Sequence, residues 1–73
     1  MKQYYIPVQI TCIRQSDKAL LGSFLWEEEA LQFDDKWVPL SVIEESCHDD
    51  IEEAGDGDVI EIYVAKWWLN KNS

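Results

Sequence analysis

The side chains that most often carry out catalysis lie together at one point of this sequence, where Cys47 is followed directly by His48. A cysteine nucleophile and a histidine base form a catalytic pair only if their side chains meet. Adjacent residues of a helix do not face each other. His48, the one histidine in the chain, is also followed by Asp49 and Asp50. We therefore expect a surface histidine among carboxylates, no catalytic residues and no enzyme activity.

Metal binding is the second chemistry that these residue types suggest. A structural zinc site takes about four Cys or His ligands, and the chain has only two cysteines and one histidine. Residues 49–58, DDIEEAGDGD, offer carboxylate oxygens but lack the spacing of a calcium loop that ends in a bidentate Glu. Their Gly-Asp-Gly sequence is typical of a turn. It is not a phosphate-binding loop, because the Lys that such a loop requires does not follow it. The sequence predicts no metal and no cofactor.

The charge of the chain is strongly negative and unevenly placed. Fifteen Asp and Glu face six Lys and Arg, for a net charge of −9. Thirteen of the acids lie in two stretches, which we call the first acidic window (residues 27–35) and the second acidic window (residues 44–58). They are Glu27, Glu28, Glu29, Asp34 and Asp35 in the first, and Glu44, Glu45, Asp49, Asp50, Glu52, Glu53, Asp56 and Asp58 in the second.

These acids leave two interpretations open. They form either a solvated face that confers solubility or a surface directed at a basic partner, whose association a concentrated field speeds. Nucleic acid itself and anionic membranes are excluded as direct partners, because phosphate binding needs Lys and Arg. No signal peptide and no membrane-spanning stretch are read from the sequence, so we expect a cytoplasmic protein with free thiols at Cys12 and Cys47.

The elements that must position these acids are mostly strands of one domain, residues 1–73. Residues 4–13 alternate in polarity and predict a first strand, in which Pro7 requires a sheet edge or a bulge. After a polar turn, residues 19–26 predict an antiparallel second strand, with Gly22 at a bulge or bend. Residues 27–35 fit either a short helical turn or the tip of a long hairpin.

The second half of the chain predicts two more strands and a helix. Residues 36–43 predict a third strand, limited by Pro39 to an edge or a kink, and residues 59–65 predict the last strand. Between them, a Ser41–Glu44 capping box and apolar residues at helical spacing predict an acidic helix over residues 42–54, with an irregular acidic loop as the alternative. The fold class is α+β and mainly β: a small bent antiparallel sheet or an SH3-like barrel of four to five strands with one short helix.

Large aromatic side chains complete the candidate surface. Phe33 is expected to fold back onto the core and to serve, with a terminal tryptophan, as an apolar contact for a partner. Trp37 and one of Trp67 and Trp68 are expected in the core. Because Trp67 and Trp68 are adjacent and do not easily point the same way, the other is expected to be partly exposed.

Three motifs occur in order along the chain: a Lys-Ala-x-Leu, a Trp-x-Pro-x-Ser-x-Ile and a final strand that runs into a tryptophan-containing terminus. Their positions are Lys18, Ala19, Leu21, Trp37, Pro39, Ser41, Ile43 and Trp67. This pattern resembles a group of small, β-rich proteins encoded by phages and prophages. Members of that group are mostly without assigned function, so the resemblance implies a phage origin and a β-rich fold. The two acidic windows depart from the group's pattern.

Two functions follow as hypotheses. The first is an anti-CRISPR-type inhibitor that places its carboxylates on the basic nucleic-acid-binding face of a host defence protein or complex. Small acidic phage proteins that block bacterial defence provide the analogy, by size, charge and setting. The alternative is a phage accessory module that binds replication or recombination proteins through a groove lined by Trp37 and Trp67. In either case we expect a monomer or a weak homodimer joined at a sheet edge.

Overall fold

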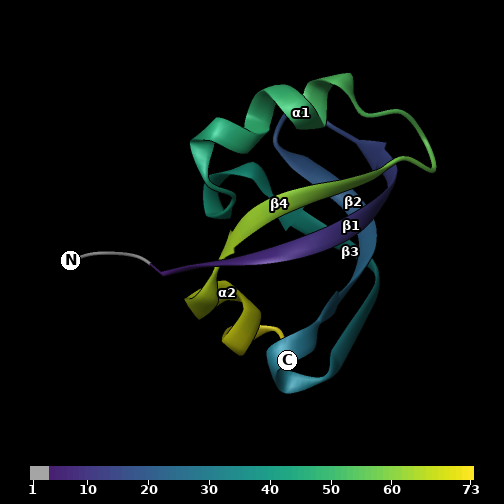
Figure 1. Cartoon of the computed structure of the whole chain (residues 1–73). Helices are drawn as coiled ribbons and strands as arrows, with labels where there is room; N and C mark the ends of the chain where they lie inside the picture. The colour runs from purple at the N-terminus through teal and green to yellow at the C-terminus, as the bar shows by residue number, and fades with distance from the viewer. Residues whose placement is uncertain (1–3) are drawn as a thin grey trace.

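In the computed structural model, which describes residues 4–73, the chain forms one four-stranded antiparallel sheet with the strand order β3-β2-β1-β4 (Figure 1). The strands are β1 (Tyr5–Gln15), β2 (Ala19–Trp26), β3 (Leu31–Pro39) and β4 (Val59–Ala65). Two short helices, α1 (His48–Glu53) and α2 (Lys66–Lys71), and three 3-10 turns complete the chain. The turns are Glu27–Glu29, Leu40–Val42 and Glu45–Cys47. The predicted mainly β, α+β fold is confirmed, and residues 1–3 of the predicted domain lie outside the described part.

Local sequence patterns predicted β2 and β4 with their observed bounds, while β1 and β3 differ, and the predicted third strand ends at Pro39 rather than at residue 43. β1 continues two residues beyond the predicted end, through Arg14 and Gln15, because both pair with β2. β3 begins five residues earlier than predicted because the second half of the first acidic window pairs with β2. The hairpin-tip interpretation is therefore correct, and the tip itself is the one-turn 3-10 helix Glu27–Glu29.

The sheet bends sharply around Gly22, as predicted for this residue. On one side, β1 shifts its register between Cys12 and Arg14, so that Ile13 is an extra residue. On the other side, β3 shifts opposite Ser23, where Asp34 and Asp35 occupy the space of one residue. Asp35 adopts a φ of 47° and donates its backbone N–H to the Ser23 hydroxyl at 3.1 Å. Such bulges increase the local twist and bend of the strands that carry them.

Because of this bend, the chain that leaves β3 reaches the opposite edge of the sheet. Ile43 forms a single antiparallel bridge with Val64 of β4, and Glu44 N–H donates to the Tyr63 carbonyl at 2.8 Å. Of the two predicted architectures, the bent sheet is the one observed. A closed barrel is not formed by residues 4–73, since β3 and β4 are the two edge strands and only this one bridge approaches closure.

Pro7 occupies an edge position within a central strand. It pairs with Tyr63 of β4, but the register between β1 and β2 begins only at Ile10, so Pro7 has a strand on one side. Pro39 ends β3 at the sheet edge. Both positions agree with the missing backbone donor of proline.

The predicted helix over residues 42–54 is wrong in its length and in its cap. Only His48–Glu53 is α-helical, preceded by the 3-10 turn Glu45–Cys47. Ile43 is held extended by its bridge to Val64, which a helical residue cannot form. Glu44, rather than Ser41, is the capping residue, and its carboxylate accepts from the Ser46 N–H at 3.2 Å.

The core lies on one face of the sheet, beneath the helical segments. Alternate residues of the strands supply it, and the segment between β3 and β4 adds Val42, Ile43, Cys47 and Ile51, all buried. α2 adds Trp68 and Leu69. Figure 1 shows α1 at one end of the sheet and α2 at the other. Neither helix, nor any other in residues 4–73, has the length and apolar character needed to cross a bilayer.

Candidate acidic interaction surface

The two acidic windows lie at opposite ends of the molecule. The first occupies the tip of the β2–β3 hairpin and continues along β3 with Asp34 and Asp35. The second occupies the segment through α1 and the loop into β4. In Figure 1 the hairpin tip is at the bottom and α1 at the top. The fold therefore does not merge the windows into one cluster, and a single partner would have to extend along the molecule to contact both.

The carboxylates of both windows face solvent. All thirteen side chains predicted to contact a partner are exposed except that of Glu44, which is half-buried. In the described chain, their hydrogen bonds come from neutral donors: Asp34 accepts from the Gln32 amide at 2.9 Å, Glu44 from Ser46, and Asp58 from the Gly55 N–H at 2.8 Å. The negative charge of the windows is thus available to an external cation.

The second window presents one exposed acidic face across the 3-10 turn Glu45–Cys47 and α1. Glu45, Asp49, Glu52 and Glu53 are exposed, whereas Ile43, Cys47 and Ile51 are buried. Helical periodicity therefore identified the correct inward residues, although Ile43 reaches the core from an extended segment. Asp56 and Asp58 follow in the turn that leads into β4.

Two of the three predicted aromatic contacts are core residues. Phe33 is 6% exposed and stacks on Phe24 with ring centroids 4.7 Å apart, and Trp68 packs on Phe33 at 6.4 Å. Phe33 thus folds onto the core and one of the two adjacent tryptophans is a core residue, as predicted, but at 6% and 7% exposure Phe33 and Trp68 offer a partner little surface. Trp67 is 50% exposed and is the terminal tryptophan that a partner can reach.

Trp37 was predicted in the core and is 45% exposed on the outer face. The bulge at Asp34 and Asp35 reverses the alternation of β3, so that Phe33 and Val38 point inward and Trp37 outward. Trp26, which the sequence analysis did not single out, is the most buried tryptophan at 1%. Its place in the alternation with Leu20 and Phe24 is the signal that identifies it.

Cys47 and His48 are held in separate environments. Cys47 is buried, while His48 Nε2 lies 3.0 Å from the Leu40 carbonyl and 3.2 Å from the Ile43 carbonyl. His48 is half-buried rather than a freely exposed residue, and it ties α1 to the turn after β3. Its Nε2 atom is engaged with these carbonyls and is not directed at Cys47. Within residues 4–73 no three Cys, His, Asp or Glu side chains are grouped to hold a metal ion.

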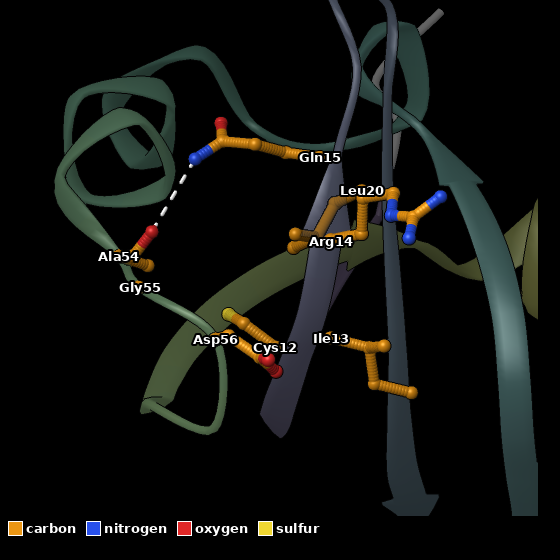
Figure 2. A pocket seen from close by; sticks show the side chains of 8 residues that line it. All are labelled: Cys12, Ile13, Arg14, Gln15, Leu20, Ala54, Gly55 and Asp56. Carbon is orange, nitrogen blue, oxygen red and sulfur yellow. Dashed lines mark hydrogen bonds between the residues drawn. The ribbon is translucent and has the colours of Figure 1, made fainter.

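Cys12 is a buried core thiol, as predicted, at the edge of a small cavity of about 190 Å³. Figure 2 shows the cavity between the end of β1 and the loop after α1, with Cys12 directed at the loop and the Arg14 guanidinium directed away from it. Gln15 Nε2 donates to the Ala54 carbonyl at 3.3 Å across the opening. Both cysteines are free thiols.

We expect the free energy of unfolding to depend on pH in the alkaline range because of Cys12. Burial, and secondarily the Asp58 carboxylate, raises the pKa of Cys12 above its ordinary value of 9.0. Above that pH the unfolded thiol loses its proton while the folded one retains it, so the free energy of unfolding falls as pH rises. Urea unfolding at a series of alkaline pH values measures this slope. Cys12→Ala is expected to flatten this slope, and equal slopes for wild type and Cys12→Ala would contradict the assignment.

Comparison of the chain with protein-family models, curated proteins and solved structures finds no match.

Proposed function

We propose that this chain is a small acidic binding protein that occupies the basic nucleic-acid-binding surface of a host defence protein or complex, as an anti-CRISPR-type inhibitor from a phage does. The observation that carries the proposal is the solvent-exposed charge of the two acidic windows, whose carboxylates have only neutral hydrogen-bond donors within the described chain. Carboxylates spaced along a molecule take the places of phosphates in a basic channel. The resemblance to phage-encoded proteins supports the setting.

The extent of the molecule supports an elongated contact. Its principal-axis extents are 29, 26 and 16 Å, and the windows lie at opposite ends. Consecutive phosphates along one strand of duplex DNA are several ångströms apart, so charges at both ends match a groove that holds a run of nucleotides. Trp67 belongs to α2, which Figure 1 shows at the end of the sheet opposite α1, and its half-exposed side chain supplies an apolar contact.

An aromatic groove receives less support as the binding site. Trp37 lies on β3 and Trp67 on α2, each about half exposed. Neither is among the residues that line four surface hollows of residues 4–73, which lie beside the end of β1, the outer edge of β4, the turn after β1 and the start of β1.

The test is capture of partners from a bacterial lysate on the tagged protein, at low and at high salt, followed by a nucleic-acid-binding assay on the purified partner. We expect a nucleic-acid-binding protein or complex that is captured at low salt, released at high salt, and prevented from binding its DNA or RNA. Salt screens exposed charges, so release is a direct consequence of a charge-based contact. A partner held through high salt, with its nucleic-acid binding unaffected, would contradict the proposal.

Charge-neutralised variants locate the contact. Glu27→Gln/Glu28→Gln/Glu29→Gln removes the charge at the tip of the first window, and a second variant, Asp49→Asn/Glu52→Gln/Glu53→Gln, neutralises three acids of α1. Each removes three exposed carboxylates, and loss of three rim contacts weakens binding by roughly tenfold. Asp17→Asn, outside both windows, is the control and is expected to bind as wild type. Full inhibition by both triple variants would rule out the windows as the contact surface.

A further inference from the structure

The outer edge of β4 carries backbone groups that have no partner in the described chain. Cys12 N–H bonds the Asp58 carbonyl and Lys66 N–H bonds the Tyr4 carbonyl, so the even-numbered residues of β4 form the hydrogen-bonded pairs with β1. In an antiparallel ladder the intervening residues direct both N–H and C=O away from that neighbour. Val59, Glu61 and Tyr63 therefore direct their backbone groups to the open side of the sheet.

One interaction confirms this geometry and sets the limit of the open edge. The Tyr63 carbonyl accepts the Glu44 N–H at 2.8 Å, from the outer side, beside the Ile43–Val64 bridge. The rest of the edge, from Val59 to the Tyr63 N–H, has no hydrogen-bond partner from other elements in residues 4–73. The segment at Ile43 and Glu44 therefore covers one end of the outer edge of β4, and the other end is open.

The open edge forms one wall of a groove. A hollow of about 520 Å³ lies between this part of β4 and the segment of Glu45–Cys47 and α1. Four acidic side chains line it: Asp50 and Glu53 from α1, and Asp58 and Glu61 from the strand side. All four are exposed. Figure 1 shows α1 above β4 along the same edge.

We propose that this groove binds an extended basic peptide segment, which adds to β4 as a fifth strand. Unpaired strand edges bind peptides through main-chain hydrogen bonds, and flanking side chains give the specificity. The carboxylates on both walls select Lys and Arg. They also disfavour a second copy of this chain, since β4 against β4 would bring the same acids together.

The pattern of the peptide follows from the alternation of a strand. Residues whose side chains turn toward α1 meet Asp50 and Glu53 and are expected to be basic. Residues that turn to the other face lie beside Val59, Glu61 and Tyr63, and those next to Val59 and Tyr63 are expected to be β-branched. A segment that alternates the two kinds fits, and a block of basic residues does not.

This inference goes beyond the proposed function, because it needs only β4, α1 and a peptide, and no contact from the first acidic window. A capped peptide of alternating Lys and Val, about six residues long at roughly 3.3 Å per residue, is the probe. Two modified forms carry N-methyl groups on all Lys or on all Val backbone nitrogens. In a paired strand only one of these sets faces β4, so one form is expected to lose about tenfold in affinity and the other to bind normally.

Amide hydrogen exchange followed by NMR locates the bound strand. On addition of the unmodified peptide, the amides of Val59, Glu61 and Tyr63 are expected to become protected. Equal affinity of the two N-methylated forms, whether high or low, would overturn the proposal, since charge attraction alone does not distinguish the two sets. So would binding that leaves these three amides unprotected.

Variants of the protein distinguish the contribution of the β4 backbone to peptide binding from that of the carboxylates. Glu61→Pro removes an outward N–H that the β4 edge does not need for its own pairing, and it is expected to abolish peptide binding. Glu61→Gln removes only the charge and is expected to weaken binding a fewfold. Asp50→Asn/Glu53→Gln is expected to weaken binding roughly fivefold, with Glu27→Gln/Glu28→Gln at the hairpin tip as the control. Equal binding by Glu61→Pro and Glu61→Gln in correctly folded protein would overturn strand addition. Failure of the wild-type protein to capture a nucleic-acid-binding partner from lysate, together with normal peptide binding, would refute the proposed function and leave this inference standing.

Discussion

Replacing Gly22 by alanine is expected to destabilise the protein by about 3 kcal/mol, near the upper end of the range for overpacked cores. A Cβ on Gly22 would lie 2.6 Å from Cγ1 and 2.7 Å from Cδ1 of Ile10, and 2.7 Å from the Thr11 carbonyl oxygen. Ile10 is fully buried, and the carbonyl belongs to the backbone of the paired strand. Neither can withdraw without displacing β1 from β2.

Gly55 provides the matched control for this substitution. A Cβ there would meet only the Asp58 carboxylate oxygen, at an ordinary contact distance of 3.5 Å. Gly55→Ala is therefore expected to change stability by less than about 1 kcal/mol. Urea denaturation monitored by circular dichroism compares the two variants with wild type. A Gly22→Ala protein as stable as Gly55→Ala would show that the sheet accommodates a side chain at the bend.

Truncation of Trp68 to alanine is expected to cost about 3–5 kcal/mol, as for other large aromatic residues in cores. Trp68 is 7% exposed, packs on the stacked pair of Phe33 and Phe24, and lies under Lys36, whose Nζ is 6.0 Å from the ring centroid. It is the residue through which α2 contacts the β2–β3 hairpin. For a domain whose total stability is typically about 5–15 kcal/mol, this loss leaves little or none.

Trp67→Ala tests the same chemical change one residue away. Trp67 is half exposed, so its truncation is expected to cost less than about 1 kcal/mol. Thermal and urea unfolding of both variants measures the difference. Similar stabilities of Trp67→Ala and Trp68→Ala would contradict the division of the pair into a core and a surface residue. Trp67→Ala also removes the exposed tryptophan of α2 at a small expected cost in stability, which makes it suitable for binding assays.

β2 and β4 have strong local patterns and were predicted with their observed bounds, whereas the bounds of β1 and β3 depend on their pairing with β2. Val59–Ala65 is rich in β-branched residues and bounded by turn residues, and its bounds need no knowledge of the rest of the chain. The α1 region is different. Its apolar spacing is helical from Ile43 onward, but Ile43 is held extended by a strand that follows it much later in the chain. No pattern within residues 42–54 contains that contact.

The positions of the aromatic residues depended on bulges, which change the alternation that identifies inward residues. A regular strand from Phe33 would direct Trp37 inward; the extra residue at Asp34 and Asp35 directs Val38 inward instead. Asp tolerates a positive φ better than most residues, so the sequence permits the bulge without marking its place. For the acidic surface, the sequence showed which residues are charged, and their exposure follows from the cost of burying charge. Their separation into two ends is a property of the fold.

The strand order has a consequence for the folding reaction. β1, β2 and β3 are joined by short turns and can pair as soon as they meet, whereas β1 pairs with β4 across the whole of residues 16–58. Closing such a long loop makes the β1–β4 ladder the slow step, since non-local strand pairing lowers folding rates. Until β4 docks, one edge of β1 and the apolar side chains of Val8 and Ile10 are uncovered. The many carboxylates between the two strands then repel neighbouring chains, so the charge that we propose as a binding surface in the folded state is also expected to oppose aggregation during folding.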